Sequence, residues 1–156
     1  MLLTLRGAPQ LYYGDEILMK NFSNPDGLVR SDFSGGWTGD KNNKFTAAGR
    51  TYDENDAFEY VRKLANYRKN TSALQTGKLM QYIPEKGIYV YFRYDSVKTI
   101  MVVYNGSDND QKVKTERYNE RIKGAKKAVN IITHETVDLS ELTVPDKSAL
   151  VLELVN

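Results

Sequence analysis

Residues 2–16 read L-L-T-L-R-G-A-P-Q-L-Y-Y-G-D-E. Short apolar runs without alternation, bounded by turn formers such as Gly7 and Gly14, are typical of strands buried on both faces. Such strands belong to parallel sheets covered by helices, where the loop after the carboxyl end of the strand helps to build the active site. The stretch therefore predicts a buried parallel strand whose exit, at Asp15 and Glu16, lies beside such a site.

The residues that follow predict a long loop and then a helix. Residues 21–53 are polar and rich in glycine, and the spaced aromatic side chains of Phe22, Phe33, Trp37 and Phe45 favour an ordered loop. Residues 53–69 place acids first, apolar side chains at a period of 3.6, and basic residues last. That charge order complements the helix dipole, so this segment is predicted as an amphipathic helix.

From residue 77 the apolar side chains follow a period of two, which indicates strands. The predicted strands are residues 78–83, 87–94, 98–105, 129–133, 136–139 and 149–155, with a short helical turn near Ile122. Many short alternating strands indicate an antiparallel sandwich.

Several motifs in this order resemble one enzyme family. G-A-P-Q-L-Y-Y-G-D-E at 7–16 closely resembles the eighth-strand motif of the α-amylase superfamily, glycoside hydrolase family 13. R-S-D-F-S-G-G-W-T-G-D at 30–40, F-T-A-A-G-R-T at 45–51 and Y-V-R-K-L-A-N-Y-R-K-N at 60–70 are similar to the cyclomaltodextrinase/neopullulanase branch, of the type found in gut Bacteroidetes.

The resemblance implies a mostly β fold with an α/β remnant. Residues 1–70 would be the last strand, active-site loop and helix of a (β/α)8 barrel. Residues 71–156 would be the antiparallel β-sandwich domain that closes such enzymes.

The implied parent is a retaining α-glucan hydrolase acting on α-1,4-glucosidic bonds of maltooligosaccharides, cyclodextrins or pullulan. In that family the three catalytic acids lie upstream of the eighth-strand motif, so no catalytic residue is assigned here and the chain itself is expected to be inactive. The alternative is a non-catalytic carbohydrate-binding or structural β-sandwich module, for which Tyr89 and Tyr91 would be the outward-facing aromatics.

Asp15 and Glu16 are not a catalytic pair in this interpretation. Glycoside cleavage needs two carboxylates that flank one bond. Adjacent residues of a strand point to opposite faces, so these two acids cannot do so.

The resemblance implies that Asp26 and Arg30, four residues apart in the loop, contact a sugar. A carboxylate acceptor beside a guanidinium fork suits vicinal hydroxyls. A salt bridge that stabilises the loop is the alternative, and Asn24 could hold the position of the acid instead. Trp37 could stack on a sugar face, or it could be a buried staple for its glycine-rich loop.

The amino-acid composition limits the classes of partner that are expected. The net charge is +2, with 22 basic and 20 acidic residues interspersed, so neither nucleic acid nor a membrane is an expected partner. With no cysteine, one histidine (His134) and no phosphate loop, neither a metal nor a cofactor is expected. The expected partners are an α-glucan oligosaccharide in the parent and a second copy of the chain, which would form a homo-oligomer covering the exposed barrel remnant. The parent could be cytoplasmic or periplasmic.

Overall fold

The structure, a computed structural model, describes residues 1–155, and its contacts divide the chain into two compact units. The first unit joins Met1–Pro9 to the chain from Leu64 onward. The second unit is Gln10–Lys63. We call them the sandwich unit and the loop unit, and each is described by itself.

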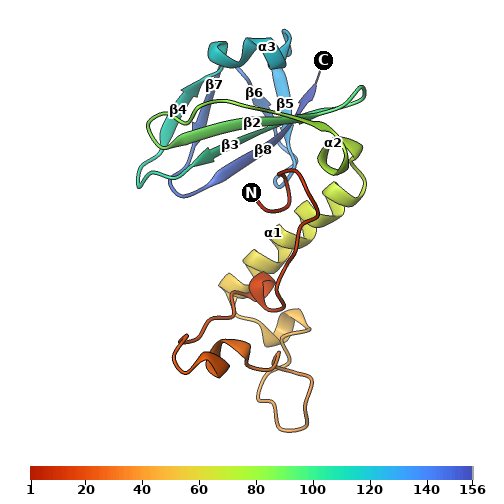
Figure 1. The fold of residues 1–156 in the computed structure, drawn as a ribbon, viewed down its shortest axis with the longest axis vertical. Coiled ribbons are helices and arrows are strands. Elements are labelled where there is room, and N and C mark those ends of the chain that lie inside the picture. Colours follow the sequence, from red (N-terminus) through yellow and green to blue (C-terminus); the bar gives the residue numbers. More distant parts are fainter. Residues whose placement is uncertain (156) are drawn as a thin grey trace. The chain divides into compact units, whose positions relative to one another are not determined.

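The sandwich unit contains two antiparallel sheets (Figure 1). The larger sheet has the strand order β1-β2-β3-β8-β5-β6 and the smaller one pairs β4 with β7. The strands are β1 (Lys78–Gln81), β2 (Ile88–Tyr94), β3 (Thr99–Asn105), β4 (Gln111–Lys114), β5 (Lys127–Asn130), β6 (Thr136–Asp138), β7 (Glu141–Val144) and β8 (Ala149–Val155). This architecture confirms a mostly β, antiparallel fold.

The main core lies between the two sheets. Alternation along β2 turns Val90 and Phe92 to one face, where both are buried. The other members of this core come from β2, β3, β5, β8, the small sheet, the segment before β5 and the residue after β6: Ile88, Met101, Val103, Val113, Tyr118, Ile122, Ala128, Leu139, Leu142, Val144 and Leu152. The short helix α3 (Asn119–Ile122) supplies Ile122 and confirms the predicted helical turn.

The opposite face of the large sheet is also covered. Tyr91, Val102 and Val151 lie on this face and are buried. The cover consists of α2 (Ser72–Gln75), whose Ala73 and Leu74 are fully buried, and of the opening residues, where Leu3 and Thr4 are buried. Neither face of the central strands is therefore left to solvent.

Helix α1 (Tyr52–Lys69) begins at a capping box. The backbone N–H of Thr51 donates to Glu54 Oε2 at 2.7 Å, and the backbone N–H of Glu54 donates to Thr51 Oγ1 at 3.3 Å. Asp53 and Glu54 lie in the first turn and Arg68 and Lys69 in the last. The predicted helix over 53–69 is thus confirmed, with its start one residue earlier.

The predicted strand within residues 2–16 is wrong. These residues form turns, followed by a 3-10 helix at Asp15–Ile17. A parallel strand needs neighbours to take up its N–H and C=O groups, and none of the described strands pairs with this segment. The backbone instead bonds locally, as in Thr4 N–H to the Met1 carbonyl at 2.9 Å.

A barrel remnant is therefore not formed as a strand–loop–helix unit in this structure. The loop unit contains three 3-10 helices, Asp15–Ile17, Asp26–Arg30 and Ala47–Gly49, and the first part of α1. The division of the chain into barrel residues 1–70 and sandwich residues 71–156 stays a prediction.

The sequence also missed two strands, β4 and β7. Each has only four residues, and the apolar ones are Val113 in β4 and Leu142 and Val144 in β7. So short an alternation cannot be told from a loop without its partner. Strand β5 begins two residues before its predicted start.

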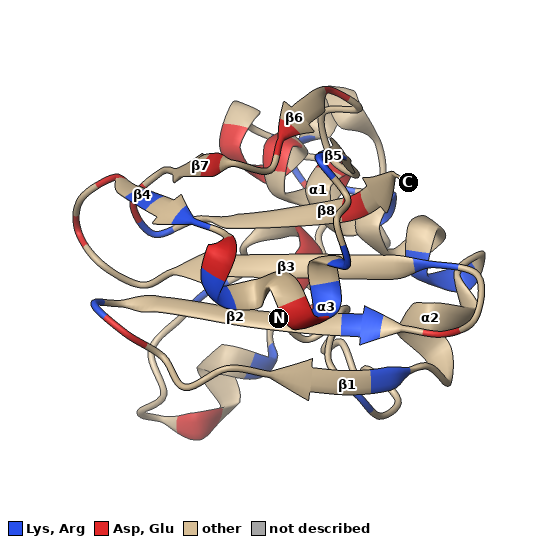
Figure 2. Ribbon diagram, turned by 90° about the horizontal axis from the view of Figure 1, so that it is seen from above, with Lys and Arg blue, Asp and Glu red and all other residues tan. Residues whose placement is uncertain are grey.

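The charges of the described residues show no concentration of one sign. Basic and acidic residues are interspersed over the ribbon (Figure 2). No helix in the described part of the chain is long and apolar enough to cross a membrane.

Candidate functional site

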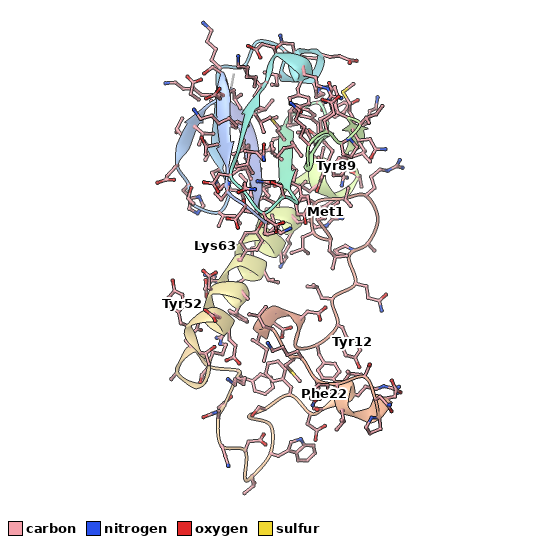
Figure 3. The ribbon with its side chains drawn as sticks, turned by 90° about the vertical axis from the view of Figure 1, so that its left-hand side faces the viewer. Met1, Tyr12, Phe22, Tyr52, Lys63 and Tyr89 are labelled. Atoms are coloured by element: carbon pink, nitrogen blue, oxygen red, sulfur yellow. The ribbon has the colours of Figure 1, made fainter. Side chains whose placement is uncertain are left out.

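The predicted site residues lie in the loop unit, around and beside a hollow of about 750 Å³. Tyr12, Tyr13, Asp15 and Arg30 are among the residues that line it. The two tyrosine rings are 4.6 Å apart, and the Tyr13 hydroxyl donates to the Ser31 carbonyl at 3.2 Å. Figure 3 shows the side chains of Tyr12 and Phe22 on these loops. Aromatic faces, a carboxylate and a guanidinium thus meet in one open depression.

Asp26 and Arg30 begin and end one 3-10 helix. Their side chains form an ion pair through Asp26 Oδ2 and Arg30 Nη2, and both are more than half exposed. The loop-stabilising salt bridge considered for this pair is therefore present, although exposed pairs contribute little to stability. Arg30 lines the hollow, but Asp26 is not among its lining residues. Whether the pair contacts sugar stays a prediction.

Trp37 is not a buried staple, because 69% of its surface is exposed. Its loop is held instead by Asp40, whose Oδ2 accepts from the backbone N–H groups of Gly35 at 2.6 Å and Trp37 at 3.1 Å. These donors lower the pKa of Asp40 below its ordinary value. The indole is free to meet a ligand, but it does not line the 750 Å³ hollow.

The role of Asp40 was missed from the sequence. The signal is an aspartate after the glycine-rich run G-G-W-T-G, since Asp often bonds nearby backbone N–H groups in turns. Nothing in that pattern identifies a ligand.

Asp15 and Glu16 both accept hydrogen bonds from backbone N–H groups of the turn around Gly14. Asp15 Oδ2 accepts from the Tyr12 N–H at 3.2 Å, and Glu16 Oε2 accepts from the Gly14 N–H at 2.9 Å. Asp15 lines the 750 Å³ hollow, whereas Glu16 lines a separate aromatic hollow of about 580 Å³ with Phe33 and Phe45. The argument from strand alternation does not apply, because both acids lie in the 3-10 helix Asp15–Ile17; that they are not a catalytic pair stays a prediction.

The outward-facing aromatic pair considered for a binding module is wrong in one member. Tyr91 is fully buried, and its hydroxyl bonds Thr4 Oγ1 at 2.5 Å. Tyr89 is half-buried, and its hydroxyl donates to Gln81 Oε1 at 2.6 Å. The cause is the cover supplied by the opening residues, which alternation within β2 does not reveal.

His134 lies where the sequence placed it, exposed in the turn between β5 and β6. Within residues 1–155, no group of three or more His, Cys, Asp or Glu side chains is arranged to hold a metal ion.

The sequence of the chain is similar to parts of known proteins. Residues 79–153 match the family model described as the cyclo-malto-dextrinase C-terminal domain. The chain is 31% identical over 124 residues to α-amylase 3 of Dictyoglomus thermophilum, covering 66% of this chain and 23% of that protein. It is 30% identical over 108 residues to a cyclomaltodextrinase of Geobacillus thermopakistaniensis, covering 68% of this chain and 16% of that one.

Solved structures show the same fold. The α-amylase of Geobacillus thermoleovorans, solved in complex with acarbose, has a TM-score of 0.72 at 21% identity, over 99% of this chain and 31% of that chain. A three-domain cyclomaltodextrin glucanotransferase has a TM-score of 0.68 at 21% identity, over 99% of this chain and 31% of its own. The chain thus spans less than a third of each of these relatives. Residues 79–153 are thus similar to the cyclo-malto-dextrinase C-terminal domain, and the chain shares its fold with parts of these two solved enzymes.

Proposed function

We propose that the chain is the C-terminal part of a retaining α-glucan hydrolase that cleaves α-1,4-glucosidic bonds of maltooligosaccharides, cyclodextrins or pullulan. The match of residues 79–153 to the cyclo-malto-dextrinase C-terminal domain carries this proposal. The finer placement in the cyclomaltodextrinase/neopullulanase branch of gut Bacteroidetes, and in starch degradation, is supported by the sequence motifs at 30–40, 45–51 and 60–70.

In this proposal the loop unit holds sugar and does not cleave it. Asp26 accepts hydrogen bonds from sugar hydroxyls, Arg30 donates to sugar oxygens, and Trp37 stacks on a sugar face. All three side chains are more than half exposed, so a ligand can reach them. A retaining mechanism needs two carboxyl groups about 5–5.5 Å apart across one bond, and the residues that would supply them lie in the parent, outside this chain.

We also propose that a second copy of the chain covers the loop unit, whose apolar side chains are largely exposed.

The 156-residue chain should release no reducing sugar from maltoheptaose or β-cyclodextrin. The reason is that Asp15 and Glu16 line different hollows and act as turn acceptors. The measurement is reducing-sugar release at high protein concentration, compared with heat-denatured chain. Turnover that disappears with Asp15→Asn or Glu16→Gln would show that these acids do the chemistry, and the proposal would fail.

Maltoheptaose should change the fluorescence of Trp37, which is the single tryptophan of the chain. Asp26→Ala should weaken this binding about tenfold, because a hydrogen bond to a charged group contributes about 1.5–3 kcal/mol. Asp108→Ala is the matched control, since it removes another exposed, ion-paired aspartate, on the sandwich unit. Binding that is unaffected by Asp26→Ala would remove Asp26 from the sugar contacts.

A further inference from the structure

Two buried arginines have no role in the proposed sugar site. Arg68 lies in the last turn of α1 and is 8% exposed, and Arg93 lies in β2 and is fully buried. Neither forms an ion pair within the described part of the chain. Buried charges normally need a partner of opposite charge, so what these two groups bind instead is informative.

Both guanidinium groups bind main-chain carbonyls of the opening segment. Arg68 Nη1 donates to the carbonyls of Leu3 at 3.1 Å and Leu5 at 3.3 Å, and Arg68 Nη2 donates to that of Gly7 at 2.7 Å. Arg93 Nη1 donates to the carbonyl of Thr4 at 3.0 Å. Four carbonyls within residues 3–7 are therefore held by two side chains.

Arg93 also links this segment to the sheet. Its Nη2 donates to the Gly77 carbonyl at 3.2 Å, just before β1, while its Nε has no partner. Burial, and then the neighbouring charge of Arg68, lower the pKa of Arg93. Two like charges close together are unfavourable, and here the hydrogen bonds to backbone carbonyls offset that cost. The Thr4–Tyr91 hydrogen bond fixes the segment from the same face.

These contacts also bear on the loop unit, because they connect residues that lie on both sides of it in the sequence. Gly7 lies three residues before the loop unit begins, and Arg68 lies five residues after it ends. The hydrogen bond from Arg68 to Gly7 therefore links the chain just before the loop unit to the chain just after it. Closing so long a loop costs conformational entropy, and contacts at its base must offset that cost. Met1 and Tyr89, labelled in Figure 3, belong to the sandwich unit, which also contains Gly7 and Arg68.

We propose that Arg68 and Arg93 are positioning residues that clamp the opening segment by its backbone carbonyls and so hold the base of the loop unit closed. The two arginines bind the backbone carbonyls of residues 3–7 and not their side chains. The contact therefore depends on the N–H donors of the two guanidinium groups. It orders the start of the segment that leads into the loop unit, where the proposed sugar contacts lie. This role holds whether or not the parent cleaves α-glucans.

The test is hydrogen–deuterium exchange on Arg68→Met, which keeps the length and apolar stem of the side chain. We expect the hydrogen-bonded amides of Thr4 and Leu5 to exchange about tenfold faster or more, while β3 and β8 stay within about twofold of the unmodified chain. The fluorescence anisotropy of Trp37 should fall in the same variant. Arg68→Lys should restore little, because one ammonium cannot reach three carbonyls as the fork does. Arg6→Met, at an exposed arginine in the same segment, is the matched control.

Two results would overturn the clamp. Unchanged exchange at Thr4 and Leu5 in Arg68→Met would mean that these hydrogen bonds do not hold the segment. An equal rise in β3 and β8 would mean that Arg68 serves the stability of the whole sandwich unit and not the closure of the loop. Because Arg93 is fully buried and its replacement can unfold the sheet, Arg93→Met is informative only where the circular dichroism of the sheet is retained, and there it should reproduce the pattern of Arg68→Met.

Discussion

Phe92→Ala should lower the free energy of unfolding of the sandwich unit by about 3–5 kcal/mol, the usual cost of removing a buried phenylalanine. Phe92 is fully buried in β2 and lies opposite Met101 of β3. Its ring lies 6.1 Å from that of Tyr82 and 6.5 Å from that of Tyr118, so a cavity would open between the sheets. Since domains are stable by only about 5–15 kcal/mol, the loss is large.

The measurement is urea unfolding followed by far-ultraviolet circular dichroism. Ile83→Ala is the control, because it removes an apolar side chain of the same sandwich unit at a position that is 80% exposed. Its effect should stay within about 0.5 kcal/mol. A loss below about 1 kcal/mol in Phe92→Ala would mean that the core between the sheets is not closely packed as described.

The chain should sediment with twice its own mass of 17.8 kDa. Of the 16 large apolar side chains exposed among the described residues, 11 lie in the loop unit, and only Ile17 of that unit's apolar residues is buried. Monomeric proteins seldom leave so much apolar surface open. A second copy that covers this surface removes it from water, at about 25 cal/mol for each Å².

Replacing both Phe22 and Phe45 by serine should return the chain to a monomer, because these side chains are 79% and 62% exposed on the loop unit. Ile83→Ser removes an equally exposed apolar side chain from the sandwich unit and should leave the dimer intact. Analytical ultracentrifugation across a range of concentrations distinguishes the two. A chain that stays monomeric throughout, or a dimer broken only by Ile83→Ser, would contradict the proposal.

Elements with strong local signals were predictable from the sequence. Helix α1 has its capping box, its charge order and a long apolar period within one segment, and β2, β3 and β8 are each a seven-residue run of mostly apolar or aromatic side chains. The opening segment could not be predicted in the same way. Its apolar run suits a parallel strand only where neighbouring strands are present, and the described chain supplies none.

The candidate site was predictable only in part. Asp26 and Arg30 meet because they are four residues apart in one helical turn, which the spacing suggests. The exposure of Trp37 and the burial of Tyr91 depend on tertiary packing that no local pattern records. The same holds for Arg68 and Arg93, since arginine is among the residues most often found at the surface.

The hydrogen bond from Arg68 to Gly7 has a consequence for how this polypeptide can be cut and rejoined. Because the Arg68 side chain binds the Gly7 carbonyl, Gly7 and Arg68 are neighbours in space although they are 61 residues apart in sequence. A short glycine-serine bridge could span them, as flexible linkers of that kind reach about 5–6 Å multiplied by the square root of their length. Other loops could therefore be joined to the sandwich unit at the same two points, in place of Gln10–Lys63.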